Sequence, residues 1–185
     1  NFLYLETTNK IISLILLASL PLFLAGFLED ITKVINAKIR LIFAILSGYF
    51  FIYFTGYKIT SVDVGLIDSI LMYNFISILL TILSIAALSN AINIIDGLNG
   101  LSLGTVSIML LSINILSFIS DDQLLIILSL TLLSLTTGLL FFTFPYGKIF
   151  LGDGGAYFLG FCLAVFVIML PERNQNVSPF SSLLI

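Results

Sequence analysis

The sequence predicts an all-α, polytopic transmembrane helix bundle. Its 185 residues are 59% hydrophobic and only 9% charged, and its mean hydropathy is +1.21, whereas soluble domains carry about 25% charged residues. The apolar residues form long runs, and about 20 of them in a helix cross a bilayer. We expect six spans, at residues 11–28, 41–57, 66–89, 101–119, 124–144 and 154–170, and the start of a seventh at 179–185.

The first run predicts a membrane helix and not a signal peptide, because Glu6 precedes any basic residue and five more spans follow. The chain begins without Met, and its last run, residues 179–185, would make only about two helical turns. We therefore expect residues 1–185 to be a single transmembrane catalytic domain, a fragment truncated at both ends.

Composition also excludes several classes of function. The chain contains no histidine, which excludes a histidine-containing hydrolytic triad and makes a zinc site unexpected. Cys162 is the single cysteine, so no intramolecular disulfide forms. The net charge is -3, and the chain has no basic cluster beyond Lys33, Lys38 and Arg40, so nucleic acid is not an expected partner.

Alternation of the spans places three polar connections, residues 29–40, 90–100 and 145–153, on one side of the membrane. This side carries four basic residues against three on the other, and an excess of basic residues marks the cytoplasmic side. The four are Lys33, Lys38, Arg40 and Lys148, and the three are Lys10, Lys58 and Arg173.

The first of these connections begins with GFLED, in which Glu29 and Asp30 end an apolar run one turn before Lys33. A structural interpretation is a solvated loop with ion pairs to Lys33 at helical spacing. A functional interpretation follows from the position of the carboxylates at the water interface of a charge-poor helix.

The second connection, NAINIIDGLNG, spaces Asn93 and Asp96 so that they share one face of a helix, and Asn99 follows near its end. Helix capping would use one Asn and one Gly, which leaves the other polar residues for a site. In the third connection, FPYGKIFLGDGG, Asp153 would either cap the next helix or bind Mg²⁺, which takes one or two carboxylates together with phosphates and water.

Carboxylates, amides and lysines on one membrane face suit a Mg²⁺-bound pyrophosphate with a nucleotide attached. A transporter is the alternative, although its ionisable groups usually lie near the bilayer midplane and not at one rim.

The three motifs, in this order, resemble those of the polyprenyl-phosphate N-acetylhexosamine-1-phosphate transferases, multi-span enzymes of bacterial cell-envelope assembly. GFLED resembles the family's G-F-x-D-D, NAINIIDGLNGL resembles N-x-x-N-x-x-D-G-x-[DN]-G-L, and FPYGKIFLGDGG resembles F-P-x-x-x-x-F-[ML]-G-D-x-G.

The resemblance implies transfer of N-acetylhexosamine 1-phosphate from a UDP-N-acetylhexosamine to undecaprenyl phosphate, with release of UMP, at the cytoplasmic face of a bacterial inner membrane. It implies Mg²⁺ as cofactor, or Mn²⁺ in its place, and is compatible with a homo-oligomer. Asn99 and the segment PERNQNVSP resemble the O-antigen or lipopolysaccharide-initiating members more than the peptidoglycan enzyme.

The resemblance also assigns roles to eight residues. They are Asn93 and Asp153 as metal ligands, Glu29, Asp30 and Asp96 as catalytic residues, and Lys33, Lys38 and Asn99 as substrate-binding residues. A phosphate monoester has a second pKa of about 6, so the lipid phosphate is largely ionised at neutral pH. We therefore expect the Glu29–Asp30 pair to position this phosphate and not to take a proton from it.

The chain departs from the family pattern in three ways. Glu29 replaces the first aspartate, Thr143 stands where many members have asparagine, and the family's basic, histidine-containing loop is missing. Two alternatives to an active transferase follow: a transporter or channel with a polar cytoplasmic mouth, and an inactive truncated transferase.

Overall fold

The structure, a computed structural model, describes residues 2–182 as a bundle of helices in which no strand forms. Six of the helices are long and apolar enough to cross a membrane, which confirms the expected polytopic bundle. The helices are α1 (Phe2–Thr32), α2 (Ala37–Thr55), α3 (Gly65–Leu71), α4 (Asn74–Ile95), α5 (Leu101–Ile119), α6 (Gln123–Thr143), α7 (Gly152–Arg173) and α8 (Pro179–Ser182). The seventh run is represented by α8 alone, and residues 183–185 lie outside the described residues.

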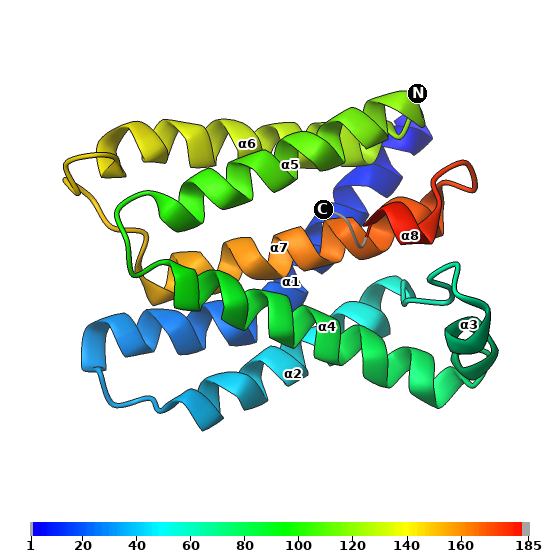
Figure 1. The fold of residues 1–185 in the computed structure, drawn as a ribbon, viewed down its shortest axis with the longest axis horizontal. Coiled ribbons are helices and arrows are strands. Elements are labelled where there is room, and N and C mark those ends of the chain that lie inside the picture. The colour runs from blue at the N-terminus through cyan, green and yellow to red at the C-terminus, as the bar shows by residue number, and fades with distance from the viewer. Residues whose placement is uncertain (1, 183–185) are drawn as a thin grey trace.

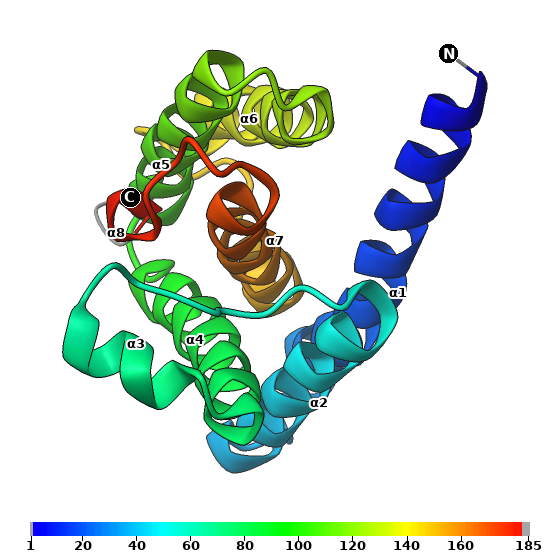
Figure 2. The same ribbon diagram turned by 90° about the vertical axis from the view of Figure 1, so that its right-hand side faces the viewer.

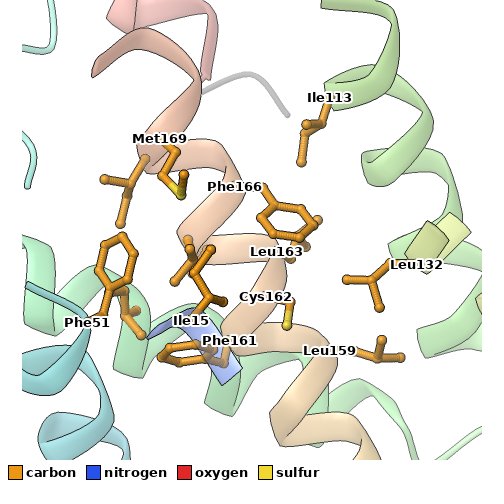
Figure 3. Packing of buried hydrophobic residues seen from close by; sticks show 14 of the residues in the cluster. Ile15, Phe51, Ile113, Leu132, Leu159, Phe161, Cys162, Leu163, Phe166 and Met169 are labelled. Carbon is orange, nitrogen blue, oxygen red and sulfur yellow. The ribbon is translucent and has the colours of Figure 1, made fainter. Parts of the chain in front are cut away.

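Helix α7 is the central element, and the other spans surround it (Figures 1 and 2). In the most apolar 18-residue stretch of α7, 78% of the residues are buried inside the protein, and the corresponding share is at most 39% in the other spans. Its side chains meet those of α1, α2, α5 and α6 in one apolar core (Figure 3). Labelled there are Leu159, Phe161, Cys162, Leu163, Phe166 and Met169 of α7, with Ile15, Phe51, Ile113 and Leu132 around them.

The third span differs from the expected residues 66–89. The helix is interrupted at Met72–Tyr73, so α3 is a separate short helix and the span is α4, Asn74–Ile95 (Figure 2). One helix from Gly65 to Ile95 would be about 47 Å long, whereas α4 alone is about 33 Å long, close to the thickness of the bilayer core. Asn90 and Asn93 therefore lie inside the span, and Asn90 Oδ1 accepts a hydrogen bond from the Tyr157 hydroxyl of α7 (3.2 Å).

The α1–α2, α4–α5 and α6–α7 junctions lie at one end of the bundle, here called the site end (Figure 1). There, α1 and α7 approach so closely that only glycine fits between their backbones. A Cβ on Gly26 of α1 would lie 2.8 Å from the carbonyl oxygen of Asp153 and from the Cα of Gly154. Small residues allow such approaches between membrane helices. The contact at Gly26 fixes the position of the first turn of α7 along α1.

At the opposite end, Asp122 joins three parts of the chain. Its buried carboxylate accepts hydrogen bonds from two amides in the first turn of α6 (both 3.2 Å), from Arg173 Nε (2.7 Å) and from Asn174 Nδ2 (3.0 Å). Arg173 Nη1 also donates to the Tyr57 hydroxyl, just after α2 (3.0 Å). Burial acts to raise the pKa of Asp122, but the bonds from Arg173 and Asn174 outweigh it and hold that pKa below its usual range. The C-terminal end of α7 is thereby tied to α6 and to the segment after α2.

Replacing Gly26 by alanine should destabilise the protein, because the added methyl group meets backbone atoms that cannot move independently. Overpacking of this kind costs about 1–3 kcal/mol. The free energy of unfolding in mixed detergent micelles measures the effect. Gly138→Ala is the matched control, because a Cβ there meets no atom within 4 Å. An equal effect of the two substitutions would contradict the proposed close contact.

Candidate active site

The residues predicted from the three motifs all lie at the site end. Glu29 and Asp30 belong to the last turn of α1, and Asp153 belongs to the first turn of α7. Asn93 belongs to the last turn of α4, and Asp96 caps the C-terminus of that helix. Alternation of the spans, as expected, therefore brings motifs that are distant in the sequence to one end of the molecule (Figure 1).

Asp30 binds the N-terminus of α7. Its two carboxylate oxygens accept the backbone N–H groups of Asp153 (2.8 Å) and Gly154 (3.0 Å). These amides have no partner within their own helix, and a negative charge at this position is stabilised by the helix dipole. The interpretation of Asp153 as the cap of its own helix is therefore wrong, because the carboxylate that caps α7 comes from α1.

The carboxylate of Asp153 is consequently free for other partners, and it forms an ion pair with Arg40 Nη1 in the first turn of α2. The side chains are 32% and 19% exposed, so the pair is partly shielded from water. The Arg40 guanidinium also lies over the Tyr157 ring, with Cζ 5.8 Å from the ring centroid, a distance at which a cation–π interaction contributes.

Asp96 adds a third carboxylate to the site. Its Oδ1 accepts a hydrogen bond from the hydroxyl of Ser102 in α5. Burial raises the pKa of Asp96, the Ser102 hydrogen bond opposes this, and the negative charges of Asp153 and Asp30 raise it further. Asp30, Asp96 and Asp153, one from each junction, thus belong to one electrostatic cluster.

Glu29 has a different partner from Asp30. Its Oε2 accepts the backbone N–H of Ile35 (2.7 Å) and holds the connection between α1 and α2. Lys33 and Lys38 are exposed, and neither forms an ion pair within the part of the chain that the structure describes. The expected pairing of Lys33 with Glu29 or Asp30 is therefore wrong, and both lysines can turn toward a ligand.

The two predicted asparagines lie in different surroundings. Asn93 is half-buried, its carbonyl accepts the Asp96 amide (3.3 Å), and its side chain makes no hydrogen bond to residues 2–182. Asn99 is exposed and lies against the α6–α7 connection, where a Cβ on Gly147 would be 2.8 Å from Asn99 Nδ2. The structure thus joins Asn99 to the third motif through Gly147.

The donor set fits Mg²⁺ better than a metal held by protein side chains alone. Within residues 2–182, no three His, Cys, Asp or Glu side chains are grouped to hold a metal, but Mg²⁺ needs only one or two carboxylates when phosphates and water complete its shell. Asp153 supplies a partly exposed carboxylate, and the three carboxylates of the cluster are accompanied by one ion-paired cation, the guanidinium of Arg40 bound to Asp153. This excess of negative charge favours a divalent cation.

Three residues of the site were not among those predicted from the sequence: Arg40, Tyr157 and Ser102. The sequence assigns Arg40 no role in the site, although a basic residue in a charge-poor chain, close after the first motif, is a usable signal. Nothing in the sequence pattern distinguished Tyr157 or Ser102 from the many other aromatic and hydroxyl residues.

The bundle and the carboxylate cluster at one of its ends define a polytopic membrane protein with a polar site at the rim of its membrane-spanning helices. Residues 12–171 match the family described as glycosyl transferase family 4. The chain belongs to this family.

Curated relatives agree with this assignment. The chain is 31% identical over 179 residues to the probable undecaprenyl-phosphate N-acetylglucosaminyl 1-phosphate transferase of Bacillus subtilis (strain 168), which covers 97% of this chain and 48% of the relative. It is 24% identical over 200 residues to the phospho-N-acetylmuramoyl-pentapeptide-transferase of Chlorobium phaeobacteroides (strain BS1), covering 92% of this chain and 54% of the relative. The protein of that name from Streptococcus thermophilus (strain CNRZ 1066) is 28% identical over 154 residues, 78% of this chain and 45% of the relative. The chain spans about half the length of these relatives.

The raised pKa of Asp96 predicts a pH-dependent effect of Asp96→Asn. Between the ordinary value of 3.8 and the higher folded-state pKa, the folded protein binds more protons than the unfolded chain, so this carboxyl makes stability fall as pH rises. Asparagine does not ionise and keeps an acceptor for Ser102. The stability of Asp96→Asn relative to the parent protein should therefore increase with pH across this window and then level off.

Thermal unfolding in detergent over a pH series measures this difference. In a protein that already carries Asp153→Asn the difference should be smaller, because one of the charges that raise the pKa of Asp96 is gone. A difference that stays constant with pH would contradict the proposed electrostatic cluster.

Proposed function

We propose that this chain forms the catalytic part of a membrane transferase that moves N-acetylhexosamine 1-phosphate from UDP-N-acetylhexosamine to undecaprenyl phosphate and releases UMP. Membership of glycosyl transferase family 4 supports the reaction class, and the name of the Bacillus subtilis relative contains both the lipid acceptor and a sugar 1-phosphate. The observation that carries the proposal is the position of Asp153: its carboxylate pairs with Arg40, its backbone amide is bound by Asp30, and its charge raises the pKa of Asp96.

In this reaction an oxygen of the lipid phosphate attacks the β-phosphorus of the UDP-sugar. The bond between that phosphorus and the oxygen bridging to the α-phosphate breaks, and UMP leaves with the bond's electrons. Asp153 and Asn93 would hold Mg²⁺, or Mn²⁺ in its place, which when bound offsets negative charge on the diphosphate. Catalysis of phosphoryl transfer consists mainly of positioning and charge stabilisation, so no protein nucleophile is required.

The contacts of Asp30 favour a positioning role over proton transfer. Both of its oxygens already accept amide hydrogen bonds from α7, and the lipid phosphate is largely ionised at neutral pH without a base. Glu29 would act indirectly, because its carboxylate binds the Ile35 amide and so fixes the α1–α2 connection. That connection carries Lys33, and Lys38 follows in the first turn of α2, so both lysines would approach the phosphates.

The remaining assignments concern the nucleotide and the membrane side. Asn99, exposed beside Gly147, would contact the uridine. The site end carries four basic residues, against three elsewhere in the chain, which supports a cytoplasmic site in a bacterial inner membrane. The preference for an O-antigen or lipopolysaccharide type of glycan over peptidoglycan rests on the resemblance of Asn99 and the segment PERNQNVSP to those members of the family.

Asp153→Asn in the complete protein should lower Mg²⁺-dependent UMP release by at least about 100-fold, because loss of a charge-stabilising group at the reacting centre has effects of this size. The assay supplies undecaprenyl phosphate with UDP-N-acetylglucosamine or, separately, with UDP-N-acetylmuramoyl-pentapeptide. Asp121→Asn, which changes an exposed aspartate at the opposite end, is the control and should leave the rate unchanged. Activity of Asp153→Asn within a few-fold of the parent would refute the metal assignment.

A further inference from the structure

Arg40 of α2 is held at the site by two residues of α7, one of which is bound in turn by α4. It projects from the first turn of α2, its Nη1 donates to Asp153 of α7, and its Cζ lies 5.8 Å from the centroid of the Tyr157 ring. The Tyr157 hydroxyl in turn donates to Asn90 of α4 (3.2 Å). The guanidinium is thus placed by packing against the ring as well as by the ion pair.

The hydrogen-bonding capacity of this guanidinium is only partly used. A guanidinium has five N–H donors, and the Nε of Arg40 is buried without a hydrogen-bond partner among the described residues. Buried donors are normally satisfied. An unsatisfied one beside a predicted phosphate site points to an acceptor that arrives with a ligand, and the planar fork of arginine is well matched to phosphate oxygens.

The partner that Arg40 does have is the residue assigned to the metal. A divalent cation at Asp153 needs lone pairs of the carboxylate, which accepts a hydrogen bond from the Arg40 guanidinium. The cation and the guanidinium, bound to the same carboxylate, would also repel each other. The metal and Arg40 therefore compete for the carboxylate of Asp153.

We infer that Arg40 is an exchangeable counter-ion of Asp153. It neutralises the carboxylate when no divalent cation is bound, and it transfers its N–H donors, Nε included, to the diphosphate of the nucleotide sugar when the cation takes its place. The inference rests on the proposed function and adds to it a phosphate-binding residue outside the three motifs.

The test measures Mn²⁺ binding to the full-length, detergent-solubilised protein by electron paramagnetic resonance, in the absence of nucleotide. Arg40→Gln removes the competitor and should tighten Mn²⁺ binding on the order of tenfold, within the usual range of coupling between two ligands of one site. Arg40→Lys keeps a competing charge and should bind Mn²⁺ nearly as the parent does. Lys58→Gln, which removes the same charge at the opposite end beside Asn74, is the matched control and should have no effect.

A second measurement tests whether Arg40 binds the diphosphate of the nucleotide sugar once the cation is in place. With Mn²⁺ saturating, both Arg40→Gln and Arg40→Lys should bind UDP-N-acetylglucosamine on the order of tenfold more weakly, because neither side chain presents the planar set of N–H donors of a guanidinium. Unchanged or weaker Mn²⁺ binding by Arg40→Gln, or unchanged nucleotide binding by both variants, would overturn the inference.

Asp153→Asn separates this outcome from failure of the proposed function. If Asp153→Asn abolishes Mn²⁺ binding and Arg40→Gln leaves it unaltered, the metal assignment stands and only the exchange is wrong. If Asp153→Asn binds Mn²⁺ as the parent does, the metal assignment itself fails, and with it the basis of the exchange.

Discussion

The carboxylate of Asp30 accepts two amide hydrogen bonds from the first turn of α7, and the geometry of the whole site end depends on this contact. It operates across the closest approach in the structure between α1 and α7, where Gly26 leaves room for the backbone of Asp153 and Gly154. A helix N-terminus buried without partners for its amides would be unfavourable. The Asp30 contact therefore allows α7 to begin at the depth where the carboxylate of Asp153 meets Arg40 of α2.

The central helix is fixed at both ends by different means. At the site end, α7 is held by backbone contact and by a carboxylate from another helix, and at the opposite end Arg173 and Asn174 bind the buried Asp122. Between these ends its side chains fill the apolar core (Figure 3). Because the other spans pack around this one helix, a change in its tilt would alter the separation of the three junctions.

Hydropathy and alternation were sufficient to predict the number of spans and the end at which the motifs gather, because bilayer thickness limits the length of each helix and every crossing reverses its direction. They were insufficient at the third span. The sequence from Leu66 to Ser89 is mostly apolar, so hydropathy does not reveal the interruption of the helix at Met72–Tyr73. That interruption depends on contacts outside the helix. Asp68 accepts the amide of Val62 (2.7 Å), and Asn74 accepts a hydrogen bond from Lys58.

In the candidate site, too, the sequence predicted some features, while others depend on contacts between helices. Alternation of the spans predicted that carboxylates of the three motifs lie at one end of the bundle, since it depends only on the number and order of the helices along the chain. The identity of their partners, Arg40 for Asp153 and the amides of α7 for Asp30, depends on the distance between helices and on side-chain rotamers, which no single motif encodes. The capping interpretation of Asp153 failed for this reason: a local rule assigned to the helix's own side chain a role that a neighbouring helix performs.

The occupied N-terminus of α7 also has a consequence for ligand recognition. Many phosphate sites capture the anion with the free amides at the start of a helix, a mode built into the backbone and therefore insensitive to sequence. Here Asp30 already uses the amides of Asp153 and Gly154, so an incoming anion finds side chains and, in the function proposed, a cation in place of main chain. In the function proposed, affinity and selectivity for the ligand would then depend on those side chains and would change by single substitutions while the scaffold stays constant.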